Sequence, residues 1–235
     1  MPQAPAVIGN LVEATLGRPA RVLGVREPAP GFLELELHAT APPGGWQPGH
    51  EIQFRVTPTL ARRYSVRTVG GPDAEHLGIL VDTGAAGPGT AWIRRLYAGR
   101  RLTLLAGRQR PLRESGTRRL YLGDGCALGT LDACATRSGD APVVTVEVPA
   151  DAVAPLADRW PLYRFLPLGE TPGEALQSWL ERAIGDGTFA RLDGALLLGH
   201  AQSLLRQRRA LVDSRSLPRH AITTRPYWAT DREGL

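Results

Sequence analysis

The sequence predicts two domains of different class, an antiparallel β-barrel followed by a smaller parallel α/β domain. The chain has 235 residues, which is enough for two domains of ordinary size. Its first half contains short strand-like runs with one helical stretch, whereas its second half alternates between strands and helices. We place the boundary within residues 111–117, which gives domains of residues 1–112 and 113–235.

In the first half, six short runs rich in branched residues predict antiparallel strands. The alternation of apolar and charged residues in Phe32–Leu37 is typical of a strand with one face in water. Turn clusters rich in Gly and Pro separate the runs, and one helix is expected over residues 90–98. Together these elements predict a closed barrel. The expected strands are 21–26, 32–38, 51–56, 64–68, 77–81 and 101–105.

In the second half, the alternation of strands and helices predicts a parallel sheet with helices on its faces. Thr171, Pro172 and Glu174 form a capping-box pattern, with Thr171 as N-cap and Pro172 as the first helical residue. The expected strands are 119–122, 143–148, 163–166, 195–198 and the extended segment 221–224. The expected helices are 127–137, 172–183 and 201–212.

Composition and charge narrow the classes of function. The formal net charge is +5, but the chain has no lysine and its arginines are scattered, so we do not expect a nucleic-acid partner. The charge favours an anionic partner such as a phosphate-bearing cofactor. No apolar run reaches the roughly 20 residues that span a bilayer, and the start of the chain does not resemble a signal peptide. We therefore expect no membrane insertion and a cytoplasmic location.

Cysteines and histidines give no sign of a metal site or a disulfide. Cys126 and Cys134 lie eight residues apart, which on one helix is about 12 Å and too far for a disulfide. We expect both to be core thiols. The five histidines are dispersed without the spacing of metal ligands.

Two segments in the first domain have the chemistry that a flavin dinucleotide needs. Arg62-Arg63-Tyr64-Ser65 offers a guanidinium to bind the pyrophosphate and an aromatic ring to lie against the isoalloxazine. It also offers a hydroxyl that can hydrogen-bond the edge of the isoalloxazine. The glycine-rich residues 84–90 precede a helical stretch, and backbone N–H groups at a helix start bind phosphate. The alternatives are an ordinary barrel strand with a packed tyrosine and a plain surface loop.

Three features of the second domain are candidates for ligand contact. Residues 123–129 resemble a dinucleotide turn after a strand, although they do not match Gly-x-Gly-x-x-Gly, and the alternative is a tight connection. Arg206 and Arg209 share one side of a predicted helix, where they would bind an anion or complement the helix dipole. The aromatic pair Tyr227-Trp228 would flank the flavin or pack in the core.

These motifs, in this order, resemble those of the siderophore-interacting proteins, a family of FAD-dependent ferric-siderophore reductases in the ferredoxin-reductase-like superfamily. The resemblance extends from about Val22 to Trp228. In the first domain, Arg62–Arg67 resembles the family's Arg-x-Tyr-Thr/Ser motif, and Gly87–Trp92 resembles its Gly-Pro-Ala-Ser-x-Trp loop. In the second domain, Gly123–Leu128 resembles the family's Gly-Asp-Glu-Thr-Ala-Leu element. The last two segments, Leu217–Arg219 and Pro226–Trp228, resemble the family's closing segment.

The resemblance implies a flavin at the junction of the two domains and a role for each motif. Ser65 would lie nearest the flavin N5 and tune its reduction, so it is the candidate catalytic residue. Arg206, Arg209 and Trp228 are the candidate substrate-binding residues. The candidate cofactor-binding residues are Arg62, Tyr64, Ser65, Val81, Asp82, Gly87, Pro88, Gly89, Thr90, Asp124, Ala127 and Leu128.

The implied activity is electron transfer from NADPH, NADH or a ferredoxin through FAD to a ferric siderophore, with release of ferrous iron. The chain departs from the family at Asp82, Gly125, Cys126 and His200. We expect the Asp82 carboxylate to face ribose hydroxyls or solvent, because a carboxylate beside a pyrophosphate is unfavourable. Because of these departures, two alternatives to a ferric-siderophore reductase stay open: a flavin reductase with another acceptor, and a non-catalytic module that binds a siderophore or a partner protein.

Overall fold

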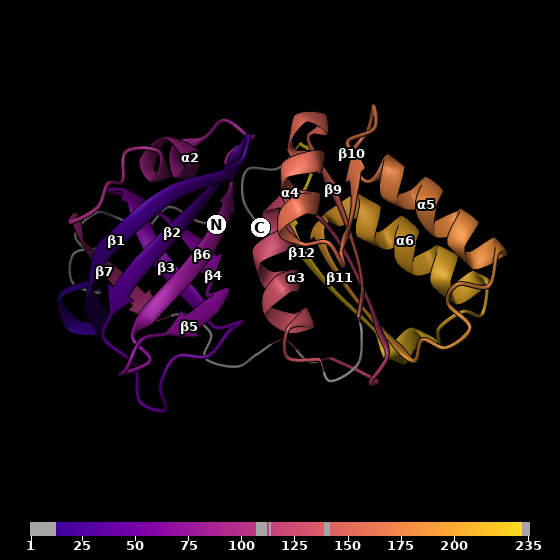
Figure 1. Cartoon of the computed structure of the whole chain (residues 1–235), viewed down its shortest axis with the longest axis horizontal. Helices are drawn as coiled ribbons and strands as arrows, with labels where there is room; N and C mark the ends of the chain where they lie inside the picture. The colour runs from indigo at the N-terminus through magenta and orange to yellow at the C-terminus, as the bar shows by residue number, and fades with distance from the viewer. Residues whose placement is uncertain (1–12, 107–111, 113, 139–141, 232–235) are drawn as a thin grey trace. The chain divides into compact units, whose positions relative to one another are not determined.

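The computed structural model describes residues 13–106, 112, 114–138 and 142–231 (Figure 1). The chain divides after Leu112 into two compact units. The first unit is built on a seven-stranded sheet and the second on a five-stranded sheet. The predicted order, antiparallel β structure followed by a parallel α/β domain, is confirmed.

The seven-stranded sheet of the first unit is antiparallel throughout, in the order β4-β3-β7-β1-β2-β6-β5. Short turns join three of the neighbouring pairs, β1–β2, β3–β4 and β5–β6, which is how antiparallel strands are often connected. The short helix α2 (Pro88–Ile93) follows β6. The strands are β1 (Gly17–Ala29), β2 (Phe32–Ala39), β3 (Glu51–Thr57), β4 (Leu60–Ser65), β5 (Thr68–Gly70), β6 (His76–Asp82) and β7 (Arg101–Ala106).

The sheet is barrel-like but is not closed, so the expectation of closure is wrong. The two edge strands, β4 and β5, are consecutive in the chain, and residues 66–67 span the gap between them. The Val66 N–H still bonds the carbonyl of His50, at 2.8 Å, whereas the Arg67 N–H bonds the carbonyl of Gly78, also at 2.8 Å. The chain changes partner at this point, and the single strand expected over 64–68 is therefore two strands.

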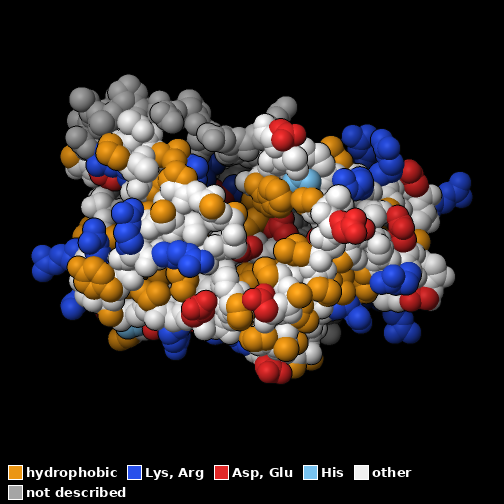
Figure 2. All heavy atoms as spheres, turned by 90° about the horizontal axis from the view of Figure 1, so that it is seen from above, with side chains coloured by type: hydrophobic (Ala, Val, Ile, Leu, Met, Phe, Trp, Pro, Cys, Tyr) orange, Lys and Arg blue, Asp and Glu red, His pale blue; other side chains and the backbone are white. Residues whose placement is uncertain are grey.

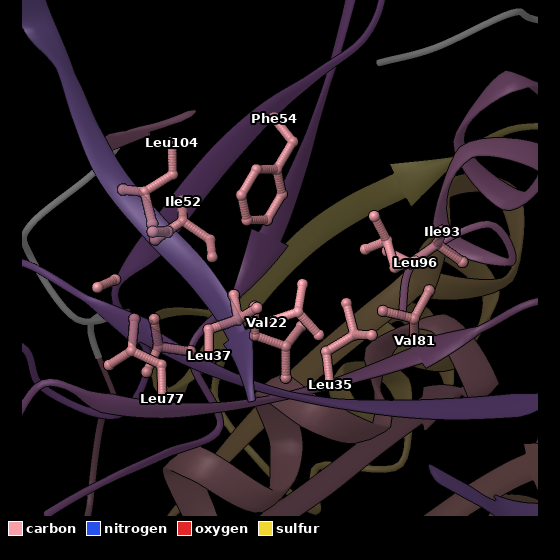
Figure 3. Packing of buried hydrophobic residues seen from close by; sticks show 14 of the residues in the cluster. Val22, Leu35, Leu37, Ile52, Phe54, Leu77, Val81, Ile93, Leu96 and Leu104 are labelled. Atoms are coloured by element: carbon pink, nitrogen blue, oxygen red, sulfur yellow. The ribbon is translucent and has the colours of Figure 1, made fainter. Parts of the chain in front are cut away.

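The core of the first unit fills the inside of this curved sheet. Apolar residues that alternate along the strands point inward, as the pattern of β2 predicted. Figure 3 shows Ile93 and Leu96, from the end of α2 and the turn after it, beside Val81 of β6. Helix α2 is thus anchored to the barrel by its buried residue Ile93.

The second unit contains five parallel strands in the order β10-β9-β8-β11-β12. Helices α5 and α6 lie on one face of this sheet, and α3 and α4 lie on the other (Figure 1). The strands are β8 (Arg119–Asp124), β9 (Val143–Val148), β10 (Arg164–Pro167), β11 (Gly194–His200) and β12 (Ile222–Trp228). The helices are α3 (Leu128–Ala135), α4 (Val153–Arg159), α5 (Glu174–Gly185) and α6 (Ala201–Asp213), with short 3-10 turns η1 (Gly125–Ala127), η2 (Ala150–Ala152) and η3 (Arg219–Ala221).

The strand order defines where the second unit can bind a ligand. From β8 the chain moves outward to β9 and β10, and then returns to β11 on the other side of β8. In open α/β sheets ligands bind outside the carboxyl ends of the strands at such a reversal. Here that point lies between Asp124, the last residue of β8, and His200, the last residue of β11.

Two local features of the second unit differ from the expectation. Helix α4 was not predicted; Pro155 lies in its first turn, where a helix tolerates a residue without an N–H. Helix α5 has Gly173 as its N-cap, with φ 75°, and so begins two residues later than expected. The Glu174 carboxylate still accepts the Thr171 N–H at 2.9 Å, which is half of the expected capping box.

No helix in the described ranges is long and apolar enough to cross a membrane. Figure 2 shows acidic, basic and hydrophobic side chains interspersed over the visible face. Large exposed hydrophobic side chains include Leu162 and Leu205.

Candidate functional site

The first unit brings its two predicted cofactor segments together. Arg62 and Tyr64 alternate with Arg63 on β4, so their side chains lie on the opposite face of the strand from Arg63. A Cβ atom at Gly89 would lie 3.2 Å from Cγ of Arg62 and 3.4 Å from Oη of Tyr64. The glycine-rich loop therefore lies directly against the side chains of Arg62 and Tyr64.

Aromatic packing fixes this arrangement. The ring of Phe54 on β3 lies 5.2 Å, between centroids, from Trp92 of α2 and 5.9 Å from Tyr64. Aromatic pairs at these separations attract one another beyond their burial of apolar area. The loop before α2 is thus held over β4 by the helix that follows it.

Hydrogen bonds shape the residues between β6 and α2. The Gly84 N–H donates to Oδ1 of Asp82 at 2.8 Å, and the Thr90 hydroxyl donates to the Ala85 carbonyl at 2.7 Å. Thr83 is buried, and its Oγ1 accepts a hydrogen bond from the Arg94 guanidinium at 3.1 Å. Burial raises the pKa of Asp82 above its ordinary value, and the bond from Gly84 acts in the opposite direction.

The other predicted residues of this unit are placed as follows. Ser65 ends β4, opposite Glu51 of β3. Burial raises the pKa of Tyr64 to about 12, so its phenol is protonated at neutral pH, and Arg62 opposes the shift. The side chain of Val81 lies in the core and serves to position Asp82. Gly87 and Pro88 begin α2, and a Cβ at Gly87 would have nothing within 4 Å.

The arrangement is suited to hold an anion beside an aromatic edge. Within the part of the chain that the structure describes, the Arg62 guanidinium makes no ion pair, and its Nη1 donates only to the Ala61 carbonyl at 3.1 Å. The N–H groups of Gly89 and Thr90 lie in the first turn of α2, where a helix provides no acceptor for them. Neither N–H has a hydrogen-bond partner in the part of the chain that the structure describes, so both can donate to a phosphate.

The second unit has its own cluster at the reversal of strand order, centred on Asp124. One carboxylate oxygen, Oδ2, accepts the main-chain N–H of His200 at 2.9 Å and the indole N–H of Trp228 at 2.7 Å. The other, Oδ1, accepts the thiol of Cys126 at 2.8 Å. Asp124 thus joins the ends of β8, β11 and β12.

Glycine makes this junction possible. Gly199 has φ +121°, and a Cβ there would lie 2.4 Å from Oδ2 of Asp124. Because β11 lies between β8 and β12, the bond from Trp228 to Asp124 crosses the end of β11. A side chain at residue 199 would collide with the carboxylate, so only glycine lets Asp124 lie there.

His200 is held at both ring nitrogens. Its Nδ1 lies 2.7 Å from Oγ of Ser203, and its Nε2 lies 2.9 Å from Oγ1 of Thr230. Ser203 donates its only hydroxyl proton to the Pro172 carbonyl at 2.6 Å, so Nδ1 of His200 is the donor in the His200–Ser203 bond. In the neutral ring Nε2 then accepts from Thr230. Burial and the nearby Arg206 charge lower the pKa of His200, which favours this neutral form.

The predicted substrate residues meet this cluster in different ways. Trp228 is partly exposed and its ring centroid lies 4.4 Å from that of His200. Arg206 is exposed and donates to the Pro172 carbonyl at 2.9 Å, whereas Arg209 is exposed one turn further along α6. Tyr227 does not join the cluster, because its hydroxyl donates to Thr130 of α3 at 2.9 Å.

The remaining predictions concern the turn after β8. Ala127 and Leu128 are buried, and Ala127 faces Gly123, where an added Cβ would lie 2.9 Å from the Cβ of Ala127.

Neither cysteine forms a disulfide. Cys134 is buried as expected, but Cys126 is exposed, so its assignment to the core is wrong. No group of three or more His, Cys, Asp or Glu side chains in the described residues could hold a metal ion.

The sequence motifs pointed to Asp124 and Trp228 as ligand-binding residues and to Cys126 and His200 only as departures from a motif. They did not single out Gly199, Ser203 or Thr230. The position of these residues in the sequence could have indicated the cluster, because polar residues that directly follow parallel strands meet at one edge of the sheet.

Comparison with solved structures identifies the class of fold, which is that of the two-domain ferredoxin reductases. A ferredoxin NADP+ reductase from Neisseria gonorrhoeae with bound FAD and NADP matches with a TM-score of 0.70 at 15% identity, over 90% of this chain and 99% of that one.

Siderophore-interacting proteins share the same fold. The protein from Acinetobacter baumannii matches with a TM-score of 0.70 at 15% identity, over 92% of each chain. SipS from Aeromonas hydrophila matches with a TM-score of 0.68 at 16% identity, over 93% of this chain and 94% of that one. The family that the sequence motifs resemble is therefore among those with this fold. No protein-family model and no curated protein sequence matches the chain.

Proposed function

We propose that the protein is an FAD-dependent oxidoreductase that passes electrons from NADPH, NADH or a ferredoxin to a ferric siderophore. The observation that carries the proposal is the contact of Gly89 with Arg62 and Tyr64, which places a guanidinium, an aromatic edge and free backbone N–H groups together. The shared fold supports it, because a reductase with that fold holds FAD and NADP.

The residues of the first unit fit FAD. Arg62 and the N–H groups of Gly89 and Thr90 would hold the pyrophosphate, and the open space beside Gly87 leaves the backbone uncovered for it. Tyr64 would lie along the isoalloxazine, and the Ser65 hydroxyl would bond its edge near N5. Asp82, whose pKa is raised by burial, would face the ribose. When bound, FAD would supply the redox chemistry, because it can accept a hydride from a nicotinamide or single electrons from a ferredoxin and can release electrons singly.

The second unit would receive the nicotinamide at the reversal of strand order. Asp124 lies there, with Ala127 and Leu128 in the turn and helix that follow. Arg206, Arg209 and Trp228 would attract and flank the anionic ferric chelate. Ferrous iron binds hard oxygen ligands more weakly, so reduction would release it. We assign this activity to the cytoplasm.

A second candidate is a flavin reductase with a different acceptor. The observation that favours it is the cluster at Asp124, because Trp228 is already bonded there and only partly exposed to an incoming chelate. The first unit and its FAD contacts are common to both candidates, so they differ only in the acceptor.

An anaerobic absorption experiment tests the proposal. The protein, saturated with FAD, is scanned after addition of NADPH or NADH, then of reduced ferredoxin in a separate sample, and finally of a ferric siderophore. We expect the flavin band to bleach with one donor and to recover with the chelate. Bleaching without recovery would favour the flavin reductase with another acceptor. Failure to take up FAD would contradict the enzymatic role and leave a non-catalytic binding module.

A further inference from the structure

A row of basic side chains crosses the outer face of the first unit. Arg101, Arg21, His38 and His76 lie on the neighbouring strands β7, β1, β2 and β6, and each residue is the direct register partner of the next (Figure 1). Directly opposed residues of antiparallel strands project from the same face of the sheet. Neighbouring strands are about 4.8 Å apart, so the four side chains form a line about 14 Å long. We call these four residues the basic row.

The basic row faces solvent. All four of its residues are exposed, whereas the residues before and after Arg21 and His38 on their strands are buried in the core. Arg21 and Arg101 are directly opposed, and like charges in that position destabilise a sheet. The stability of the barrel therefore does not account for the pair.

The arginines of the basic row lack the carboxylate partners that a neighbouring arginine has. Arg26, farther along β1, forms ion pairs with two glutamates of β2. In the described part of the chain neither Arg21 nor Arg101 forms an ion pair. The one carboxylate in that part that lies within ion-pair distance of the row is Glu75, whose Oε2 is 3.4 Å from Nε2 of His38. The charge of both arginines is thus available to a partner.

An aromatic and an aliphatic side chain flank one end of the basic row. The Val22 N–H bonds the Arg100 carbonyl at 2.9 Å, so this end lies beside the turn that precedes β7. Leu23 and Tyr97 are 40% and 59% exposed there. The Arg100 guanidinium lies over the Tyr97 ring, 5.8 Å from its centroid. A tyrosine has an apolar body and a polar tip, which suits the boundary between a membrane and water.

The chemistry of this face indicates which kind of partner it fits. The basic row lies on the outside of a sheet and is too long for one phosphate or carboxylate group to contact throughout. A layer of anionic lipid headgroups offers phosphates to the arginines and an apolar boundary to Leu23 and Tyr97. A nucleic-acid backbone offers phosphates but no apolar contact for the leucine.

We propose that the outer face of β7, β1, β2 and β6 attaches the protein to an anionic lipid surface without inserting into it. Each arginine near such a surface strengthens attachment, and the attraction falls off within a Debye length. The strongly anionic leaflet of a cell membrane faces the cytoplasm, which agrees with the location assigned above. Leu23 and Tyr97 enter the headgroup layer beside the arginines.

Sedimentation of the full chain with lipid vesicles tests the proposal. The vesicles contain phosphatidylcholine with phosphatidylglycerol, or phosphatidylcholine alone. The variant Arg21→Glu places an opposite charge beside Arg101, so it should fold at least as stably as the wild type. The matched control is Arg219→Glu, which changes the net charge equally at an exposed arginine of the second unit. We expect the wild type to bind the anionic vesicles only. Arg21→Glu should weaken this binding about tenfold or more, and Arg219→Glu about twofold or less.

Three results would overturn the proposal. These are no preference of the wild type for anionic vesicles, equal weakening by the two charge reversals, and duplex DNA binding of the same strength that Arg21→Glu also abolishes. Urea denaturation checks that each variant is folded. Arg21→Gln, which removes the charge without reversing it, should give an intermediate loss of vesicle binding. The proposed function fails separately, because vesicle binding needs neither FAD nor an electron donor.

Discussion

The Asp124 carboxylate lies closer to the backbone of Gly199 than any side chain at position 199 would allow. A Cβ atom at residue 199 would come within 2.4 Å of Oδ2, and the φ of +121° there is one that other residues rarely adopt. This contact lets Asp124 bond both His200 and Trp228 across the end of β11. The reversal of strand order is therefore built around a glycine.

Gly199→Ala should destabilise the second unit. The added methyl group must displace the carboxylate, and the backbone must hold a strained φ, so we expect a loss of about 2–3 kcal/mol in the free energy of unfolding. The matched control is Gly185→Ala at the end of α5, where a Cβ would meet nothing within 4 Å. Alanine there should stabilise slightly. Equal effects in urea denaturation would contradict this account.

Glu34→Gln should break a buried ion pair in the barrel. Glu34 is 2% exposed and pairs with Arg67, which crosses the gap between β4 and β5. Removal of one partner takes this carboxylate away from the largely buried Arg67 guanidinium, and we expect a loss of about 3–5 kcal/mol. Glu36→Gln is the control, because the Glu36 side chain is 48% exposed and, among the described residues, forms an ion pair only with Arg26. Its loss should stay below about 1 kcal/mol. Thermal and urea unfolding measure both.

His200 should make the stability fall at acid pH. Its pKa is lowered in the folded state from the ordinary value of 6.5, so the unfolded chain takes up a proton first as the pH decreases. The contribution of His200 is complete above pH 6.5 and is lost progressively as the pH falls from 6.5 to the folded pKa. Unfolding free energies of the wild type and His200→Gln, measured across this range, should converge toward low pH. A difference between the two free energies that stays constant over this range would contradict the account.

Local sequence patterns were sufficient to predict the class of each unit and the meeting of Arg62, Tyr64 and the loop at Gly89. Strand alternation and the change to helix-strand alternation are properties of neighbouring residues. The motifs around Arg62 and Gly89 also lie only about one hairpin apart, so their convergence follows from the topology of the barrel.

The remaining features depend on contacts between distant residues. Asp124 meets Trp228, 104 positions away, only because the strand order places β8 and β12 on either side of β11. The split of the expected strand 64–68 reflects a change of partner at Val66, which hydrophobicity does not encode. Pro155 concealed α4, because a proline in the first turn looks the same in sequence as a helix breaker.

FAD binding is the most direct test of the central claim, that Arg62 and the loop at Gly89 form the cofactor site. We would titrate FAD into the apoprotein by fluorescence quenching and compare Arg62→Ala with Arg63→Ala, its exposed neighbour on the opposite face of β4. Loss of a charge-assisted bond to the pyrophosphate should raise the Kd of Arg62→Ala about 10- to 100-fold. Arg63→Ala should bind like the wild type. No FAD binding by the wild type, or equal losses in the two variants, would contradict the account.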